Sequence, residues 1–397
     1  YEGPGLKKIS DEHLKLASSL FLLFKEERTS VLKPLAIDAQ EGTGSMGDDT
    51  ALAVMSKMNR QIYDFFRQQF AQVTNPPIDS LREVGVMSLE TCYGPELNIY
   101  EETPEHAKRL VTTSPVLSYK KLQSILKNKY FDIYEASLSF SNKTSLKDAI
   151  INLQKNIVSQ VKSGKAIIHL IEEVPNKGSL CINALLAVGA VHQKLVKLGL
   201  RSDANIIITT SSARDTHQIA CLIGYGATAV YPTLAYQTIL DLSHRNELSG
   251  EPHANCARYR KGINKGLLKI ISKMGISTIS SYRGSQLFEI VGLNNDIVDL
   301  CFTNSVSRIG GKNFNEINKN LIDQDQISRS NISDMKVGGL LKYVHGGEYH
   351  TYNPQVVKKL QEAVSSGNFD IYNEYAELVD QRQPSMLRDL LQIRDVK

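Results

Sequence analysis

Residues 130–231 alternate short apolar runs with longer amphipathic runs. Short apolar runs are typical of buried strands, and apolar residues three and four apart are typical of one helix face. The pattern predicts strands at 130–140, 166–171, 205–210 and 227–231 and helices at 146–161, 182–198 and 214–223. Strands that alternate with helices pair in parallel through right-handed crossovers. The sequence therefore predicts an α/β fold of parallel βα units, and its periodicity leaves open whether the sheet stays open or curls into an incomplete or distorted (β/α) barrel.

Upstream of these units, an amphipathic helix is predicted to end at a pair of prolines. Its apolar residues recur at the spacing of one helix face: Ile62, Phe65, Phe66, Phe70 and Val73. Pro76 and Pro77 end the helix, because proline lacks an N–H and pushes the preceding residue out of the α region. Asp79 is well placed to cap the element that follows.

Helical extensions are predicted on both sides of the βα core. Beyond the core, the pattern predicts a strand at 276–280, a helix near 286–291, a hairpin at 338–353 and helices at 354–364 and 369–378. Asn, Asp, Gln and Ser dominate the stretch before the hairpin, which predicts a linker. The expected division is an amino-terminal part at 1–125, the βα core at 126–311, a polar linker at 312–335 and the hairpin and helices at 336–397.

Composition and charge narrow the class of protein. The 397-residue chain is 42% hydrophobic and 22% charged, as in an ordinary globular protein. Its net charge of +4 argues against a dedicated nucleic-acid binder, and no stretch approaches the ~20 apolar residues of a membrane span. Its five cysteines are widely scattered, which indicates reduced thiols in an intracellular compartment, cytoplasmic or organellar. The chain begins at Tyr1, and we expect it to be part of a longer protein.

Residues 42–47 have the spacing G-x-G-x-x-G of a dinucleotide-binding turn. Pro34 interrupts the segment where the preceding strand should lie, and Asp48 and Asp49 put negative charge where a pyrophosphate would bind. These features favour a plain glycine-rich turn, with Met46 in the core, over a dinucleotide site.

Two further groups could carry chemistry. His345, Glu348 and His350 lie close together, but alternation in a hairpin separates them onto opposite faces, which favours surface residues over a metal site. Residues 214–217 open a helix directly after a strand, where α/β proteins place ligand groups. A helix cap formed by Asp215 or Thr216 is the simpler interpretation.

Motifs along nearly the whole chain resemble the central domain of glutamate synthase. FAQVTNPPIDSLRE at 70–83 is followed by MSLET at 87–91, and GSMGDD precedes them at 44–49. Further matches follow in the family's order at 102–106, 114–117, 273–278, 281–284, 307–311 and 375–379. So many motifs in one order exceed chance agreement.

The resemblance implies a connecting role within a larger enzyme. In that family a glutamine amidotransferase domain frees ammonia, which travels through a tunnel to 2-oxoglutarate, and FMN reduces the resulting imine with electrons from an iron–sulfur cluster. The central domain lies between these chemistries and is an α/β domain related to the flavin barrel. This chain lacks the amino-terminal cysteine nucleophile, the flavin barrel and the cluster cysteines of the family. We therefore expect it to carry no cofactor and no catalytic residue of its own and to be inactive alone.

The resemblance also implies site residues. It places Met46, with Ser45 and Gly47, near the flavin and 2-oxoglutarate in the full-length enzyme, where a thioether could contact a planar ring. Asn75 and Arg82 would line the ammonia tunnel or brace the flavin domain, and the alternative is that they only fix the proline corner.

Two segments depart from the family pattern, at 40–42 and 169–174. They affect loop detail and not the resemblance to the family. The second hypothesis, from a different class, is a free-standing α/β binding or scaffold domain that has lost the enzyme context and has no catalysis. The expected partners under the first hypothesis are the amidotransferase and FMN domains of the same chain, with no nucleic acid and no membrane.

Overall fold

The computed structural model describes residues 5–42, 55–56, 58–69, 82–330 and 335–391, which form two compact units. The first unit consists of Tyr1–Leu23, Glu27–Asp48 and Arg60–Met335. The second consists of Phe24–Glu26, Asp49–Asn59 and Lys336–Lys397. The division predicted from the sequence remains a proposal.

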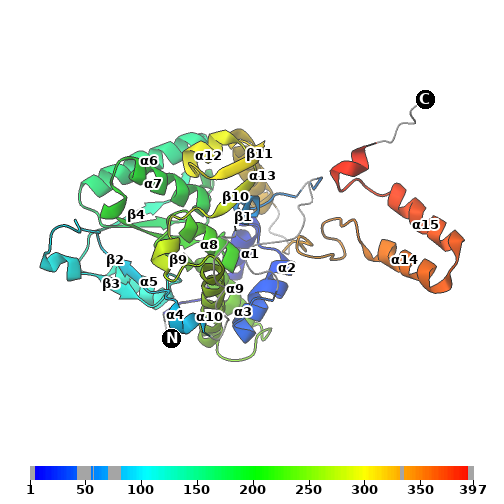
Figure 1. Ribbon diagram of the computed structural model, residues 1–397, viewed down its shortest axis with the longest axis horizontal. Coiled ribbons are helices and arrows are strands. Elements are labelled where there is room, and N and C mark those ends of the chain that lie inside the picture. The colour runs from blue at the N-terminus through cyan, green and yellow to red at the C-terminus, as the bar shows by residue number, and fades with distance from the viewer. Residues whose placement is uncertain (1–4, 43–54, 57, 70–81, 331–334, 392–397) are drawn as a thin grey trace. The chain divides into compact units, whose positions relative to one another are not determined.

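A four-stranded parallel sheet forms the centre of the first unit (Figure 1). Its strands are β4 (Ile133–Ser137), β6 (Ile167–Ile171), β8 (Asn205–Thr210) and β9 (Ala229–Pro232), in that order. They are joined by α6 (Leu146–Lys162), α7 (Ala184–Lys197) and α8 (Thr216–Gly224). The βα units predicted from the sequence are therefore confirmed. Across the sheet, the strands follow one another in the same order as along the chain. This is the strand order of an incomplete (β/α) barrel.

Local sequence explains where these elements begin. All six residues of β8 are buried, as expected for a strand of a parallel sheet covered on both faces. Each helix starts at a polar side chain that accepts a backbone N–H: Ser145 from Asp148, Asn183 from Leu185 and Asp215 from Gln218. Such caps satisfy donors that have no partner within the helix.

A second sheet has the order β1-β10-β11. It consists of β1 (Phe66–Gln68), β10 (Phe288–Leu293) and β11 (Val306–Lys312). β1 runs antiparallel to β10, and β10 runs parallel to β11. The helix predicted near 286–291 is therefore wrong, because those residues pair with strands distant in the sequence.

The amphipathic helix predicted from residue 62 is also wrong within the described residues. Ile62–Phe65 form a 3₁₀ turn, η2, and β1 follows at once. The ring of Phe66 lies 4.9 Å from that of Phe302 and 5.2 Å from that of Tyr225, and its backbone pairs with Ile290. Of the residues with three-and-four spacing, Ile62 and Phe66 are buried, Phe65 is half-buried, and Phe70 and Val73 lie outside the described residues. The spacing thus indicated burial at 62 and 66 but not the element that buries these residues.

The predicted polar linker contains helix α13 (Phe314–Ser330), which packs against α1 (Asp11–Leu20) and α6. Its buried face includes Gln324, whose Nε2 donates to the backbone O of Ser19 at 2.8 Å. Because part of the buried face is polar and internally hydrogen-bonded, hydropathy did not reveal it. The strand predicted at 276–280 is likewise absent, and α11 (Ile279–Tyr282) overlaps its end.

The remaining elements of the first unit surround the two sheets. Their bounds are α3 (Lys33–Asp38), α4 (Glu83–Val86), β2 (Thr91–Tyr93), β3 (Leu110–Thr112), α5 (Tyr119–Leu126), β5 (Ser139–Ser141), β7 (Ser179–Cys181), α9 (Thr233–His244), α10 (Pro252–Lys273) and α12 (Asn295–Cys301). β2 pairs with β3 and β5 with β7, both antiparallel.

The second unit contains a helical pair, α14 (Pro354–Ser366) and α15 (Phe369–Asp380), as predicted. The predicted hairpin at 338–353 is wrong, since this segment forms no strand and winds around the Glu26 carboxylate. That carboxylate accepts the backbone N–H groups of Leu340, Leu341 and Lys342 at 2.6, 3.2 and 2.9 Å. Across both units, none of the helices that the structure describes is long and apolar enough to span a membrane.

Truncating Phe66 should test the aromatic packing. We expect Phe66→Ala to lower the free energy of unfolding by roughly 3–5 kcal/mol, because it empties a fully buried site. Tyr130→Ala is the control, since that ring is 76% exposed. Gln68 is unsuitable as a control because its side chain bonds Tyr282 and Leu287. Equal midpoints for both variants in urea unfolding would contradict the packing.

Candidate functional site at the carboxyl ends of the parallel strands

The site residues expected from the resemblance lie mostly beyond what the structure describes. Ser45, Met46, Gly47 and Asn75 are outside the described residues. Arg82 is described and exposed, directly before α4. Their proposed roles therefore remain predictions.

A buried carboxylate lies where β6 and β8 end. Glu172 follows β6, is 0% exposed, and accepts from the backbone N–H of Ala184, Ser211 and Ser212 at 2.8, 2.9 and 2.8 Å. The hydroxyls of Thr210 and Ser212 donate to the same carboxylate at 2.7 and 2.9 Å. Carboxyl ends of strands are where barrel enzymes place their ligand groups. Here the donors at that position are directed at the protein's own carboxylate.

Tyr63 closes this cluster from η2. Its hydroxyl lies 3.1 Å from Ser212 Oγ. Burial, and then the Glu172 carboxylate, raise the pKa of the Tyr63 phenol well above its ordinary value. The phenol is therefore neutral, and it offers a hydrogen bond rather than a charge.

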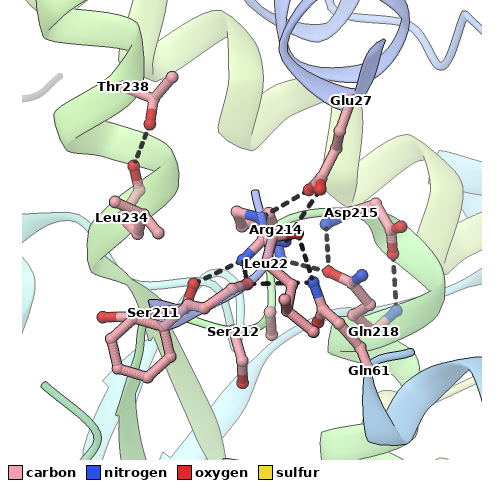
Figure 2. A network of polar contacts seen from close by, with 12 residues as sticks. Leu22, Glu27, Gln61, Ser211, Ser212, Arg214, Asp215, Gln218, Leu234 and Thr238 are labelled. Atoms are coloured by element: carbon pink, nitrogen blue, oxygen red, sulfur yellow. Dashed lines mark hydrogen bonds and ion pairs between the residues drawn. The ribbon is translucent and has the colours of Figure 1, made fainter. Parts of the chain in front are cut away.

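Arg214, at the end of the loop after β8, is the centre of a second buried network (Figure 2). Its Nε and Nη2 donate to the two oxygens of Glu27 at 2.5 and 2.8 Å, a bidentate ion pair. Nη1 donates to the backbone O of Phe21 and of Ser211 at 3.1 and 2.8 Å, and Nη2 to that of Leu22 at 3.4 Å. The guanidinium thus ties the segment after α1 to the loop that binds Glu172.

Asp215 caps helix α8, which confirms the simpler interpretation of residues 214–217. Its Oδ1 accepts from the backbone N–H of Gln218 at 2.7 Å, and Gln218 Oε1 accepts in return from the Arg214 N–H at 2.7 Å (Figure 2). Burial raises the pKa of Asp215 to about 7 against the effect of that Gln218 N–H, and Glu27 and Glu41 add to the increase.

A carboxylate, an imidazole and a hydroxyl are aligned across three neighbouring strands. His169 Nδ1 lies 3.0 Å from Glu135 Oε2, and its Nε2 lies 2.8 Å from Thr209 Oγ1. Burial lowers the pKa of His169, which favours the neutral ring. Thr209 is only 4% exposed, so its hydroxyl does not reach a substrate, and the three groups stabilise the sheet.

The described residues offer no ligand set for a metal ion or an iron–sulfur cluster. No group of three or more His, Cys, Asp or Glu side chains among them is arranged to hold a metal ion. Three of the five free cysteines are buried singly, at 221, 256 and 301.

No pattern in the sequence identified Glu172 and Glu27 as members of buried polar networks. A charged residue directly after a buried strand was a usable indication for Glu172, which also lies in a segment that departs from the family pattern. Nothing in the sequence paired Glu27 with Arg214, because these residues are far apart along the chain.

The fold and the closed polar cluster define a class: an α/β protein of barrel-like βα units whose usual ligand end is filled by its own side chains. The model of the glutamate synthase central domain matches residues 17–294. The chain belongs to the glutamate synthase central domain family.

Relatives agree with this assignment. The chain is 39% identical to ferredoxin-dependent glutamate synthase of Cyanidium caldarium over 92% of its own length and 25% of that protein. It is 37% identical to the NADPH glutamate synthase large chain of Azospirillum brasilense over 97% of its own length and 26% of that protein. It therefore spans about a quarter of the length of these relatives. Flavocytochrome b2 of baker's yeast aligns over 50% of this chain and 47% of its own, with a TM-score of 0.30 and 11% identity, a likeness too small to support any conclusion.

Breaking the Glu27–Arg214 pair should be costly. We expect Glu27→Gln to lower the free energy of unfolding by about 3–5 kcal/mol, because it leaves a buried cation without its counter-charge. The control is Arg308→Ala, which breaks an exposed 3.2 Å pair with Glu289 and should cost at most about 1 kcal/mol. A double replacement, Glu27→Leu with Arg214→Met, should cost less than the sum of its single changes. Additive losses in urea unfolding would show that the two side chains are not coupled.

Asp215 should make stability depend on pH. The folded carboxyl group keeps its proton up to about pH 7, whereas the unfolded group loses it near 3.8. The folded state thus binds more protons between these values, and stability from this group is present at low pH and lost as pH rises. Relative to Asp215→Asn, the native protein should lose about 2–3 kcal/mol between pH 5 and 8. Asp203→Asn, at an exposed position, is the control, and its free energy of unfolding should change with pH as that of the native protein does. Parallel curves for native protein and Asp215→Asn would refute the shift.

Proposed function

We propose that this chain is the connecting part of a glutamate synthase, placed between the glutamine amidotransferase domain and the FMN domain of one polypeptide. One observation carries the proposal: similarity at 37–39% identity runs through 92–98% of this chain but covers only about a quarter of each relative. A chain similar throughout to about a quarter of an enzyme is best explained as that quarter.

The closed carboxyl end of the sheet supports a connecting rather than a catalytic role. Glu172 is saturated by protein donors, and Arg214 directs its guanidinium at protein acceptors. A ligand-binding site needs hydrogen-bond donors that protein groups do not already use. The Glu172 and Arg214 networks leave few such donors. The polar groups at the carboxyl end are buried and bonded to one another, which suits a wall against which other domains pack.

The complete enzyme would then make L-glutamate from glutamine and 2-oxoglutarate. FMN and an iron–sulfur cluster would belong to the rest of the polypeptide, since the described residues hold no cluster ligands. Two relatives are named for different electron donors, ferredoxin and NADPH, so similarity does not choose the donor for this chain. We place the enzyme inside the cell, in the cytoplasm or an organelle.

The proposed contribution to the reaction is local. Met46, between Ser45 and Gly47, would contact the flavin and 2-oxoglutarate pocket, and the glycines beside it would allow close backbone approach. Asn75 and Arg82 would line the ammonia tunnel or brace the FMN domain. The competing hypothesis is a free-standing scaffold, which predicts a reading frame without amidotransferase and FMN domains on its two sides.

Met46→Ala in the complete polypeptide tests this placement. We expect glutamate formation from 2-oxoglutarate and free ammonia to fall about tenfold or more, because an apolar contact near a reacting centre contributes ~1–3 kcal/mol. Glutamine hydrolysis measured alone should change much less. Met58→Ala, the same change outside the glycine-rich motif, is the control. If ammonia-dependent synthesis is unaffected by Met46→Ala, the site assignment is wrong, and if the native polypeptide makes no glutamate, the proposed function is wrong.

A further inference from the structure

A pocket of about 360 Å³ opens at the other end of the parallel sheet. Asn205, the first residue of β8, and Thr228, just before β9, lie in its wall, so the pocket adjoins the amino ends of these strands. β2 and the segment around α11 complete it. Its volume is within the range of small-molecule sites. The Glu172 and Arg214 networks do not contribute to it.

The pocket wall contains an amide donor without a partner among the described residues. Asn205 is 5% exposed, and its Oδ1 accepts from the backbone N–H of Gly94 at 2.6 Å. Its Nδ2 has no acceptor among the described residues and is not one of the side-chain atoms shielded from solvent, so it is open to the pocket. The amide orientation is determined by the Gly94 bond, so the unpaired group in the pocket wall is a donor. A ligand there must supply an acceptor.

Gly94 connects this donor to a guanidinium. The Gly94 carbonyl accepts from Arg109 Nη1 at 2.7 Å, while its N–H holds Asn205. Its φ of +128° and the 2.7 Å that would separate an added Cβ from Phe131 require glycine at this position. The Asn205 amide and the Arg109 guanidinium are therefore both hydrogen-bonded to Gly94, a position that only glycine can occupy.

The charges of the lining balance. Four charged side chains line the pocket: Glu90, Glu96, Arg109 and Arg283. Arg283 and Glu96 already form an ion pair at 3.3 Å. Within the described part of the chain, Arg109 has no carboxylate partner and Glu90 has no cation. A ligand that complements both must carry one negative and one positive charge.

We propose that this pocket binds a free α-amino acid. The ligand carboxylate accepts from Asn205 Nδ2 and the Arg109 guanidinium, and its ammonium group donates to the Glu90 carboxylate. A simple anion would leave Glu90 unpaired and a simple amine would leave Arg109 unpaired, so the zwitterion fits best. The proposal concerns a different site from the reaction discussed above and does not depend on it.

Binding is tested on the full 397-residue chain with the L-amino acids one by one, by thermal shift and then by calorimetry. We expect at least one to bind at millimolar concentration or tighter. Its desamino acid and its α-carboxamide, which each lack one charge, should bind about tenfold more weakly or worse. Absence of binding by every amino acid, or equal binding of either analogue, would overturn the proposal.

Three variants locate the site. Glu90→Gln removes the proposed ammonium acceptor from an exposed side chain that has no described partner, and Asn205→Asp keeps the acceptor for Gly94 but replaces the free donor. Each should weaken binding about tenfold or more. Glu102→Gln, exposed and outside the lining, should bind like the native chain. Unchanged affinity in Glu90→Gln would overturn the site even if Asn205→Asp failed to fold.

Cys92 provides an independent measurement. It lines the pocket and is the exposed member of the five free cysteines. Alkylation by iodoacetamide, followed by mass spectrometry of the Cys92 peptide, should slow several-fold when the amino acid is bound. The same amino acid should give no protection in Glu90→Gln. If the amino acid binds but does not change the alkylation rate of Cys92, binding occurs elsewhere and the proposed site is wrong.

Discussion

The bidentate pair between Arg214 and Glu27 is the interaction on which the polar interior of the first unit depends. A buried guanidinium is tolerated only when a counter-charge and acceptors surround it, and here one carboxylate and three backbone carbonyls do so. The carbonyl of Ser211 belongs to the same loop whose N–H groups bind Glu172. The backbone O of Arg214 also accepts from Tyr259 on α10 at 2.7 Å. One residue, through its side chain and its backbone carbonyl, therefore orders the loop after β8, the turn after α1 and the contact with α10.

This ordering has a functional consequence. In a (β/α) barrel the carboxyl ends of the strands present loops that bind substrate, and here the equivalent loops bind one another. The chain has a scaffold of βα units, and its polar groups at that end are structural. Membership of the glutamate synthase central domain family fits such a scaffold. The open pocket lies instead at the amino ends of the strands, where an unpaired amide and two unpaired charges remain.

Two adjacent glutamates organise different parts of the molecule. Glu27 belongs to the first unit and neutralises Arg214. Glu26 belongs to the second unit, where its carboxylate gathers three successive backbone N–H groups. Neither role is visible in the sequence, because the partners of both carboxylates are far away along the chain. The carboxylates differ only in which donors the folded chain brings to them.

The sequence by itself determined the βα core, the cap of α8 and the family. Apolar runs such as 205–210 and cap residues such as Asp215 act through neighbours a few residues away, and such interactions are readable from spacing. Tertiary structure decided the rest. Phe66 is in a strand because β10 pairs with it from far along the chain, and α13 is a packed helix because its polar face finds hydrogen bonds on α1. Glu172, Arg214 and Asn205 acquire their roles only when distant segments deliver their partners, or fail to deliver one, since the energy of a buried polar group depends on those partners and not on its own position in the sequence.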